Sequence, residues 1–254
     1  MKNPKSKHEE FLDSKLVKRK SILAFGVFFI LLILVIASWK WINNQPTDQG
    51  ALKPLRKLLD INEKIFSTVF DTTKLIKEYP LSAAAKKVRA NGVEGIRDNV
   101  DEKTWRLNVI KDNGDTLKVT LDEIKLLPKK DIIFDFKCIE GWSQVTHWAG
   151  VPLKEFMKHY HLGNEAMKKY VGLSTPDNGY YVGIDMPSAL HPQTLLCYEM
   201  NGKALPKIQG YPLRLIIPVK YGVKHLKRIG TMYFSNKKPA DYWAERGYDY
   251  YTGH

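Results

Sequence analysis

The sequence predicts a domain of mixed α+β class that follows one membrane-spanning helix. Residues 22–37 form an unbroken apolar run, which is typical of a helix in a lipid environment. Residues 55–70 carry apolar side chains at helical spacing. Residues 104–110, 117–121 and 132–136 alternate apolar and polar side chains, as half-buried strands do.

Composition limits the classes of protein to which the chain can belong. With 254 residues, of which 44% are hydrophobic and 26% charged, it can bury a core of one or two globular domains. The formal net charge of +13 favours an anionic partner, such as a membrane surface or a phosphorylated small molecule. No zinc-finger spacing and no aromatic RNA-binding motif is present, so we expect no nucleic-acid partner.

The apolar run near the N-terminus predicts a membrane anchor. Extended to Ile42, it reaches the roughly 20 residues that a bilayer-spanning helix needs. Trp39 and Trp41 suit the membrane interface. Seven Lys or Arg residues lie in residues 1–20, which favours a cytoplasmic N-terminus. We therefore expect a single-pass protein of the inner (cytoplasmic) membrane, with its catalytic domain in the periplasm or outside the cell.

The alternative to an anchor is a cleaved signal peptide. The run is long for the apolar part of a signal, and no small-x-small cleavage pattern follows Ala37. Lys18-Arg19 is at best a weakened twin-arginine export signal. We therefore expect an uncleaved anchor.

These patterns divide the chain into four parts. We expect a cytoplasmic basic segment over 1–20, a transmembrane helix over 21–42, a linker and helical segment over 43–85, and a catalytic domain over 86–254. The helical pattern of the third part is expected to continue, in broken form, over residues 71–85.

Several loops and short elements precede the central strand. The glycines around Arg89 and Asn91 indicate a loop that either approaches a ligand or is a plain connection. Turn residues at 112–115 join the strands on either side into a hairpin. A short helical turn is expected over residues 121–127.

The chain has two cysteines, so a disulfide framework is excluded and each thiol is considered alone. Cys138 follows the strand at 132–136, where loops carry chemistry, although an isolated cysteine is often a small core residue. Cys197 lies in the apolar sequence Leu195-Leu196-Cys197-Tyr198, so we expect it to be an inert core thiol.

The segment around Cys138 resembles the cofactor-binding motif of the sulfite oxidase family of molybdoenzymes. The matching sequences are Lys137-Cys138-Ile139-Glu140-Gly141-Trp142-Ser143 and Trp148-Ala149-Gly150-Val151-Pro152-Leu153, the second of which starts the helix expected over 153–160. Further similar blocks lie at 171–185, 191–206, 209–218 and 221–229. The resemblance implies a single sulfite-oxidase-type molybdopterin-binding domain of α+β class, similar to the periplasmic bacterial branch.

The resemblance also implies a cofactor and a set of site residues. The cofactor is Mo-molybdopterin, with Cys138 as the catalytic residue and the metal ligand; a thiolate suits molybdenum, which prefers soft sulfur donors. The implied cofactor-binding residues are Arg89, Asn91, Thr175, Gln209, Arg214, His225, Leu226 and Lys227.

Several of these residues suit the phosphate of the pterin. Arg214, His225 and Lys227 are expected to meet it as charge-assisted donors, with Lys224 and Arg228 as further candidates. At the position of Gln209 the family usually has His or, in the periplasmic branch, Asn, and Gln can also hydrogen-bond the cofactor.

The implied activity is oxygen-atom transfer, most simply the reduction of a sulfoxide-like substrate, which is a small molecule or a protein-bound oxide. The alternatives are oxidation of sulfite or a related oxyanion, a non-catalytic anchored binding module, and an enzyme that uses Cys138 with Glu140 as a lone thiol. No haem, flavin or iron–sulfur motif occurs in the sequence, so we expect a separate electron-transfer protein, a membrane haem protein or a quinone-linked one.

Two expectations concern the C-terminal part of the chain. It ends about 40 residues after Arg214, so we expect one catalytic domain and no dimerisation domain. Its aromatic residues form either a lid over the substrate or a tail that packs on the core; they are Tyr242, Trp243, Tyr248, Tyr250 and Tyr251.

Overall fold

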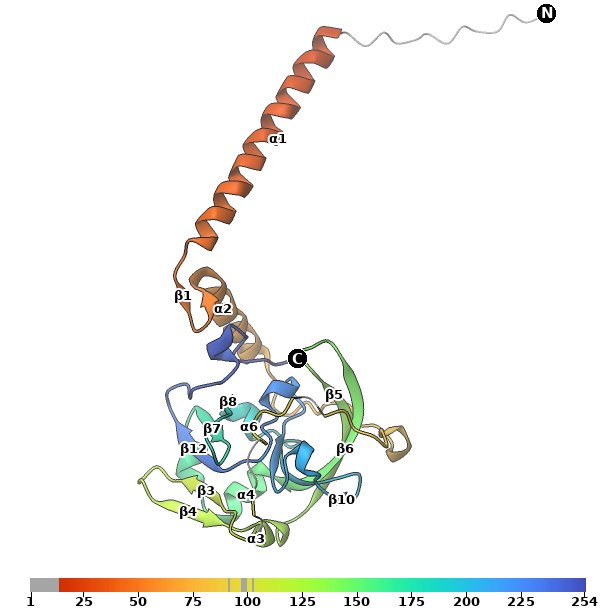
Figure 1. Ribbon diagram of the computed structural model, residues 1–254, viewed down its shortest axis with the longest axis vertical. Helices are drawn as coiled ribbons and strands as arrows, with labels where there is room; N and C mark the ends of the chain where they lie inside the picture. The colour runs from red at the N-terminus through yellow and green to blue at the C-terminus, as the bar shows by residue number, and fades with distance from the viewer. Residues whose placement is uncertain (1–13, 91, 97–99, 102) are drawn as a thin grey trace, which may run out of the picture. The chain divides into compact units, whose positions relative to one another are not determined.

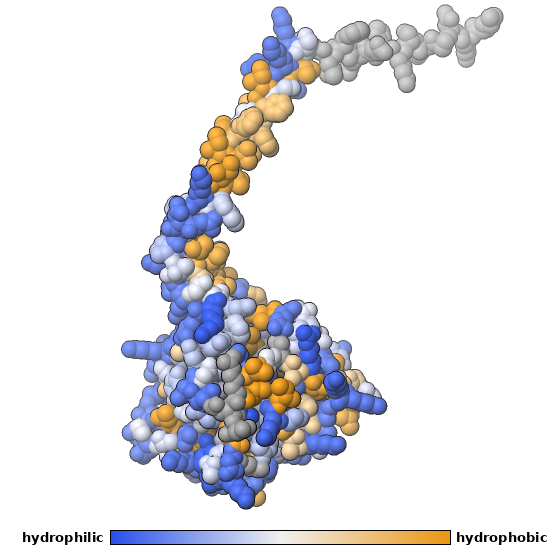
Figure 2. All heavy atoms as spheres, viewed as in Figure 1, coloured by the Kyte–Doolittle hydropathy of each residue, from blue (hydrophilic) through white to orange (hydrophobic). Residues whose placement is uncertain are grey.

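The computed structural model describes residues 14–254 except 91, 97–99 and 102, and it divides into two compact units. The first unit consists mainly of α1 (Ser14–Asn43), whose side chains are exposed along the helix. Figure 2 shows an apolar band along the middle of this helix, which Figure 1 labels α1. Within the described residues, α1 alone has the length and apolar composition of a membrane span, a test that a signal sequence also passes.

The division between the two units falls within a small hairpin, β1 (Thr47–Asp48) and β2 (Ala51–Leu52). The helix α2 (Lys53–Val69) follows and confirms the helical pattern at 55–70. The expectation of a broken helix over 71–85 was wrong. Apart from one 3₁₀ turn, Leu81–Ala83, this segment runs beside the sheet, because its amides bond to the sheet edge: Tyr79 N–H donates to Ile133 O (2.8 Å).

The first of the two main sheets is antiparallel and carries the long hairpin that ends at Cys138. Its order is β10-β9-β6-β5, with β11 also paired to β9. The hairpin pairs Lys130 with Gly150 at one end and Lys137 with Ser143 at the other. The strands are β5 (Lys130–Lys137), β6 (Ser143–Pro152), β9 (Leu195–Met200), β10 (Lys203–Ala204) and β11 (Arg214–Ile216).

The second sheet has the order β4-β3-β12-β7-β8 (Figure 1). Its β3–β4 hairpin confirms the one expected from the turn at 112–115, and β12 joins β3 in parallel. The strands are β3 (Leu107–Ile110), β4 (Thr116–Val119), β7 (Tyr170–Ser174), β8 (Tyr181–Asp185) and β12 (Thr231–Ser235).

Short helices complete this unit. The expected turn after residue 121 is α3 (Leu121–Lys125), which begins with a capping box between Thr120 and Glu123. The helix expected after Pro152 is α4 (Leu153–His159); α5 (Gly163–Ala166) and α6 (Met186–Ala189) are shorter.

The unit has two clusters of buried apolar side chains. The larger one joins residues of the second sheet to α3, α4 and α6, and the smaller one lies among strands of the first sheet. Helices and mostly antiparallel strands therefore build one domain of mixed α+β class, as the sequence predicted.

Candidate functional site

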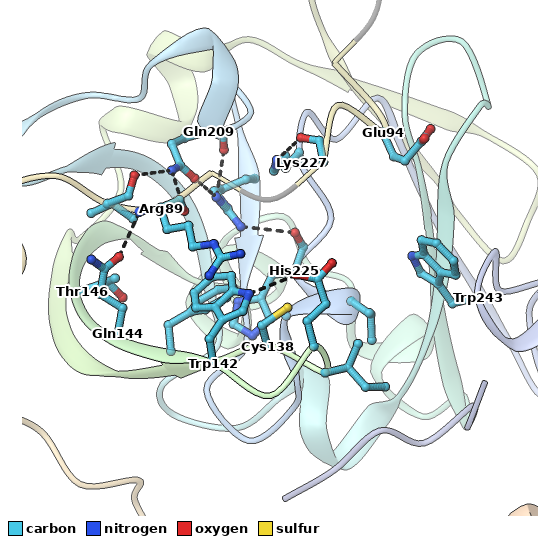
Figure 3. A pocket seen from close by; sticks show the side chains of 18 of the residues that line it. Arg89, Glu94, Cys138, Trp142, Gln144, Thr146, Gln209, His225, Lys227 and Trp243 are labelled. Carbon is cyan, nitrogen blue, oxygen red and sulfur yellow. Dashed lines mark hydrogen bonds between the residues drawn. The ribbon is translucent and has the colours of Figure 1, made fainter.

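A cavity of about 300 Å³ lies where the end of the β5–β6 hairpin meets two loops far away in the sequence. One loop contains Arg89 and Glu94, and the other side is formed by residues 209–227. Figure 3 shows the sulfur of Cys138 near the centre of the labelled side chains. The structure thus brings together six of the predicted site residues: Arg89, Cys138, Gln209, Arg214, His225 and Lys227.

A tight loop at the tip of the β5–β6 hairpin holds Cys138. Its backbone N–H donates to Trp142 O (2.9 Å), and its carbonyl accepts from Gly141 N–H (3.0 Å). Gly141 has φ +86°, a left-handed conformation that glycine adopts without the steric cost of a Cβ atom. The Cys138 side chain is 5% exposed and lines the cavity, so the loop presents the thiol to a ligand there and hides it from bulk water.

Arg214 supplies a buried positive charge to the cavity. It lies on β11 and is 3% exposed, with its guanidinium 4.6 Å from the ring centre of Trp148. One terminal nitrogen, Nη1, donates to the backbone oxygen of Gln209 (3.0 Å) and to its side-chain Oε1 (2.8 Å). Burial lowers the pKa of Arg214 to about 10, and its buried Nε has no hydrogen-bond partner in the described structure.

Gln209 connects Arg214 to the loop on the other side of the cavity. Its Oε1 accepts from Arg214, and its Nε2 donates to the carbonyls of Val88 (3.5 Å) and Arg89 (3.3 Å). Gln209 is 3% exposed. The side chain therefore uses both ends of its amide to join the guanidinium to the Arg89 loop.

Lys227 adds a second cation beside Arg214. Its Nζ donates to Gly92 O (3.0 Å), and burial, followed by the charge of Arg214, lowers its pKa to about 8. Gly210, with φ +102°, packs so closely here that a Cβ atom would lie 2.9 Å from Lys227 Cα. The glycine thus lets the two chain segments approach closely.

His225 lines the cavity, but the structure contradicts its expected role as a charged donor. Its Nδ1 accepts from Ile217 N–H (3.4 Å) and its Nε2 lies 3.1 Å from Lys220 O, so the backbone occupies both ring nitrogens. Burial, followed by the charge of Arg214, lowers its pKa to about 3. The imidazole is therefore neutral, and its edge packs on Phe136, with ring centres 4.7 Å apart.

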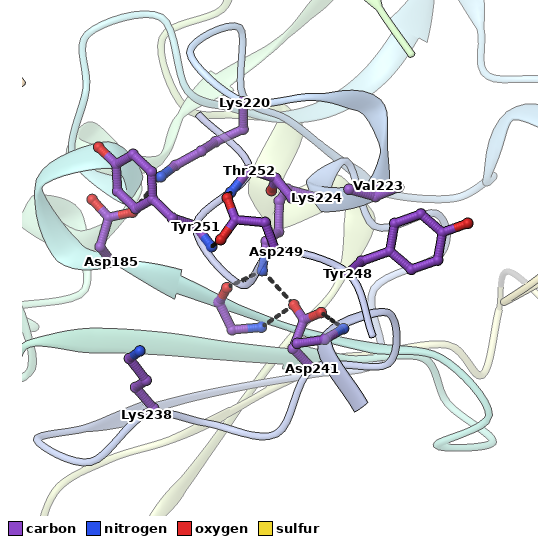
Figure 4. A network of polar contacts seen from close by, with 12 residues as sticks. Asp185, Lys220, Val223, Lys224, Lys238, Asp241, Tyr248, Asp249, Tyr251 and Thr252 are labelled. Carbon is purple, nitrogen blue, oxygen red and sulfur yellow. Dashed lines mark hydrogen bonds and ion pairs between the residues drawn. The ribbon is translucent and has the colours of Figure 1, made fainter. Parts of the chain in front are cut away.

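The two further candidates for phosphate contact have other partners. Lys224 is buried and pairs with Asp241, and its Nζ also donates to Gly183 O (2.9 Å) (Figure 4). Arg228 Nε donates to Tyr211 O (3.0 Å). Neither side chain lines the cavity. Their contact with the phosphate of the pterin therefore remains a prediction. Within residues 224–228, the side chains of His225 and Lys227 line the cavity, and those of the other three residues do not.

Arg89 lies at the exposed side of the cavity. Its guanidinium stacks 4.6 Å from the ring centre of Trp142, whose indole N–H donates to Glu140 Oε2 (3.1 Å). Gln144 fixes the backbone, because its Oε1 accepts from Arg89 N–H (2.9 Å) and its Nε2 donates to Lys87 O (3.1 Å). For the loop around Arg89, the sequence left open whether it approaches a ligand or only connects two elements. In the structure this loop forms part of the cavity wall.

Two other predicted site residues, Thr175 and Leu226, do not line the cavity. Thr175 is fully buried, and its hydroxyl accepts from Tyr180 N–H (3.1 Å), so it orients a residue that does line the cavity. Leu226 is also fully buried, and its carbonyl accepts from Leu215 N–H (2.9 Å). Asn91 lies outside the described residues. Cys197 is buried as expected, with its pKa raised to about 12 by burial.

Aromatic side chains outside the predicted set of cofactor-binding residues also line the cavity. Trp142 and Trp148 come from the hairpin, and Tyr180 donates its hydroxyl to Val223 O (2.7 Å). Trp243 and Tyr248 come from the C-terminal segment, so part of the Tyr-rich end is cavity wall. Tyr250 and Tyr251 are buried, as expected for a tail that packs on the core. Aromatic content was the one signal available in the sequence.

The cavity suits an anionic, partly aromatic ligand that is held near a thiol. Three cations and two carboxylates are among the residues that line it: Arg89, Arg214 and Lys227, with Glu94 and Glu140. The unpartnered Nε of Arg214 is a buried donor that an anion would satisfy. Among the described residues, no group of three or more His, Cys, Asp or Glu side chains could hold a metal ion. A metal here would have to arrive with other ligands, and a cofactor that brings its own sulfur donors fits this donor set.

The fold and the cavity define a mixed α+β domain in which a cysteine and buried cations line one cavity. A family profile described as "Oxidoreductase molybdopterin binding domain" matches residues 93–243. The chain belongs to this family, the molybdopterin-dependent oxidoreductases of sulfite oxidase type, as the sequence motifs indicated. It is therefore a molybdopterin-binding oxidoreductase of mixed α+β fold.

Known proteins and solved structures that are similar to this chain include the following three. A protein of Azospira oryzae that carries the name of a protein-methionine-sulfoxide reductase subunit, YedZ1, is 34% identical over 81% of this chain and 78% of its own length. The protein-methionine-sulfoxide reductase catalytic subunit MsrP of Campylobacter jejuni is 27% identical over 92% of this chain and 80% of its own. The sulfane dehydrogenase SoxCD of Paracoccus pantotrophus aligns with TM-score 0.49 and 18% identity, over 56% of this chain and 40% of its own.

Proposed function

We propose that this oxidoreductase reduces a sulfoxide-like substrate, small or protein-bound, while anchored in the inner membrane. The names of its relatives, protein-methionine-sulfoxide reductase subunits, support the direction of the reaction. The cavity supports the cofactor, since it combines a shielded thiol with the buried guanidinium of Arg214. Among the described residues, no carboxylate is a hydrogen-bond partner of this guanidinium. That combination is the observation that carries the proposal.

We assign Cys138 as the ligand of molybdenum. The other proposed cofactor-binding residues are Arg89, Asn91, Thr175, Gln209, Arg214, His225, Leu226 and Lys227. When bound, the molybdenum cofactor supplies two-electron redox chemistry coupled to the movement of one oxygen atom. The chain's own part is to hold the cofactor, and the hairpin loop around Gly141 keeps the Cys138 thiol turned toward the cavity.

The polar side chains have separate tasks in this proposal. Arg214 and Lys227 meet the anionic end of the cofactor, and Gln209 keeps the Arg214 guanidinium in position. His225 acts as a neutral packing group against Phe136 and provides no charge. Trp142, Trp243 and Tyr248 form apolar wall that excludes water from the reacting centre.

Location and electron supply are also part of the proposal. The division is the one expected from the sequence: a cytoplasmic basic segment over 1–20, a transmembrane helix over 21–42, a linker and helical segment over 43–85 and a catalytic domain over 86–254, in the periplasm or outside the cell. The relative from Campylobacter is named a catalytic subunit, which supports a separate electron donor. We propose that this donor is a membrane haem protein or a quinone-linked one.

An activity screen of the purified full chain, produced in a host that makes the cofactor, tests this function. Reduced viologen supplies electrons for methionine sulfoxide, free and in an oxidised protein, and an artificial acceptor is used with sulfite. We expect reduction of sulfoxide and little oxidation of sulfite. Activity with sulfite alone would contradict the proposal and favour the oxidation of an oxyanion.

The same preparations test two competing functions, a binding module and a lone-thiol enzyme. A non-catalytic module would be inactive in both assays even when it holds the cofactor. A lone-thiol enzyme that uses Cys138 with Glu140 would be active without molybdenum and would lose activity on alkylation.

A further inference from the structure

The outer face of α2 is apolar and exposed. Leu58, Ile61 and Ile65 recur at spacings of three and four residues, so they lie on one side of the helix. Six apolar side chains of α2 are between 46% and 69% exposed: Leu55, Leu58, Ile61, Ile65, Phe66 and Val69. Part of this surface is visible over α2 in Figure 2. A contiguous apolar surface of this kind marks a site of contact with a protein or a membrane.

The inner face of α2 is fixed to the catalytic domain, so the apolar face cannot turn inward. Arg56 is 5% exposed, and its terminal nitrogens donate to three carbonyls: Gln49 (2.8 Å), Ala244 (2.7 Å) and Tyr248 (3.0 Å). Further along the helix, Glu63 accepts from Lys238 Nζ (2.6 Å).

The charges of α2 suit an anionic surface. Lys57 and Lys64 are exposed and lie seven residues apart, two helical turns, so they line one edge of the apolar face. The two carboxylates of the helix, Asp60 and Glu63, both lie within 4.0 Å of Lys238. An exposed apolar face with lysines along its edge is typical of a helix that lies in the plane of a membrane surface.

The short linker between α1 and α2 keeps α2 close to a membrane surface when α1 spans the membrane, as proposed. Nine residues separate the end of α1 at Asn43 from the start of α2 at Lys53. Even fully extended, they span at most about 35 Å. A membrane that holds α1 is therefore never far from α2.

We propose that α2 lies in the head-group layer of this membrane. Leu58, Ile61 and Ile65 enter the boundary with the acyl chains, and Lys57 and Lys64 contact anionic head groups. Through Arg56, the lipid-bound helix is connected to the segment that carries the cavity residues Trp243 and Tyr248. Docking therefore fixes one wall of the cavity at the membrane surface. This inference rests on the proposed anchor.

A spin label measures the depth of α2 directly. The full chain, with Cys138→Ser and Cys197→Ser to leave one reactive thiol, is reconstituted into phosphatidylcholine vesicles with or without phosphatidylglycerol. A nitroxide is attached through Ile61→Cys, or through the control Ser67→Cys on the same helix but off the apolar face. Collision with oxygen reports lipid, and collision with a water-soluble nickel chelate reports water.

We expect the label at position 61 to collide with oxygen and to be shielded from nickel, and the label at position 67 to behave in the opposite way. In vesicles with phosphatidylglycerol, Lys57→Gln or Lys64→Gln should each lower the ratio of docked to undocked helix about fivefold. Without the anionic lipid, these substitutions should have little effect.

A label on α1, through Leu31→Cys, separates failure of the anchor from failure of this inference. Lipid exposure at 31 with water exposure at 61 would overturn the docking of α2. Water exposure at 31 would overturn the anchor, and position 61 would then decide the docking alone. A label at position 61 that collides with the nickel chelate in lipid vesicles, but is shielded from it in native membranes, would also overturn the lipid contact. That result would assign the apolar face of α2 to a protein partner.

Discussion

Arg214 and Gln209 form a buried pair in which the Arg214 Nη1 lies 2.8 Å from the side-chain oxygen of Gln209. The amide is neutral, so it orients the guanidinium without cancelling its charge. A carboxylate at this position would neutralise the cation and compete with an anionic ligand. The pair thus keeps a positive charge available at the cavity, although burial of that charge costs folding free energy.

Replacement of Arg214 should affect the cofactor more than the fold. In Arg214→Met, the cofactor-free chain loses a buried charge, so its free energy of unfolding should stay within about 1 kcal/mol of wild type or rise. Retention of the cofactor should fall about 10- to 100-fold, because charge-assisted hydrogen bonds are lost. Thermal unfolding and molybdenum analysis measure the two effects. A destabilised chain that still holds full molybdenum would contradict this assignment.

Binding of the cofactor should weaken as the pH rises through about 8. Lys227 has a pKa of about 8 in the free site, lowered by burial and by Arg214. Below this pH the side chain is a cation that attracts the anionic cofactor, and above it the charge is lost. A bound anion raises the pKa of Lys227, so in the complex the charge is lost at a higher pH. The rate of cofactor release between pH 7 and pH 9 tests this. Lys227→Arg should remain charged and show a flat profile, and an equally steep profile there would point to another group.

Gly141→Ala tests the backbone of the loop that holds Cys138. Gly141 has φ +86°, and an added Cβ would meet no atom within 4 Å, so the substitution isolates the cost of the left-handed conformation. We expect a loss of about 1–2 kcal/mol in the free energy of unfolding. Gly163→Ala, at an equally open glycine without positive φ, is the matched control and should be neutral or stabilising. Equal effects at both positions would rule out backbone strain.

Arg56→Met tests the connection between α2 and the cavity wall. The substitution removes one donor from each of three carbonyls, so the turn at 244–248 should open more often. Hydrogen exchange of the amides in this turn should accelerate about 10-fold or more. Lys57→Met, one residue further along the helix and exposed, should leave the exchange rates unchanged. Unchanged exchange in Arg56→Met would show that the turn is held by other contacts.

Much of the fold follows from local patterns in the sequence. The helix α2, the β3–β4 hairpin and the strand that leads to Cys138 were each predicted, because each has a clear periodicity or turn signal. The segment 71–85 was not, because its backbone is held by the edge of the sheet. A bond between Tyr79 and Ile133 joins residues far apart in the sequence, and no local pattern reports it.

The candidate site residues were predicted only where the sequence resembles the motifs of the sulfite oxidase family. Cys138, Gln209 and Arg214 lie around one cavity, but their assignment as ligands of the cofactor remains a prediction. The charge of His225 could not be predicted, because it depends on two backbone partners and complete burial. The same holds for Lys224, whose partner Asp241 belongs to the C-terminal segment.

Molybdenum content tests the central claim, that Cys138 holds the metal of a molybdopterin cofactor, most directly. The full chain, Cys138→Ser and the matched control Cys197→Ser are purified from a host that makes the cofactor, and molybdenum per chain is measured. We predict about one molybdenum per chain in the wild type and in Cys197→Ser, because the Cys197 thiol is buried away from the cavity, and a large loss in Cys138→Ser. Full retention of molybdenum in a folded Cys138→Ser chain would contradict the claim.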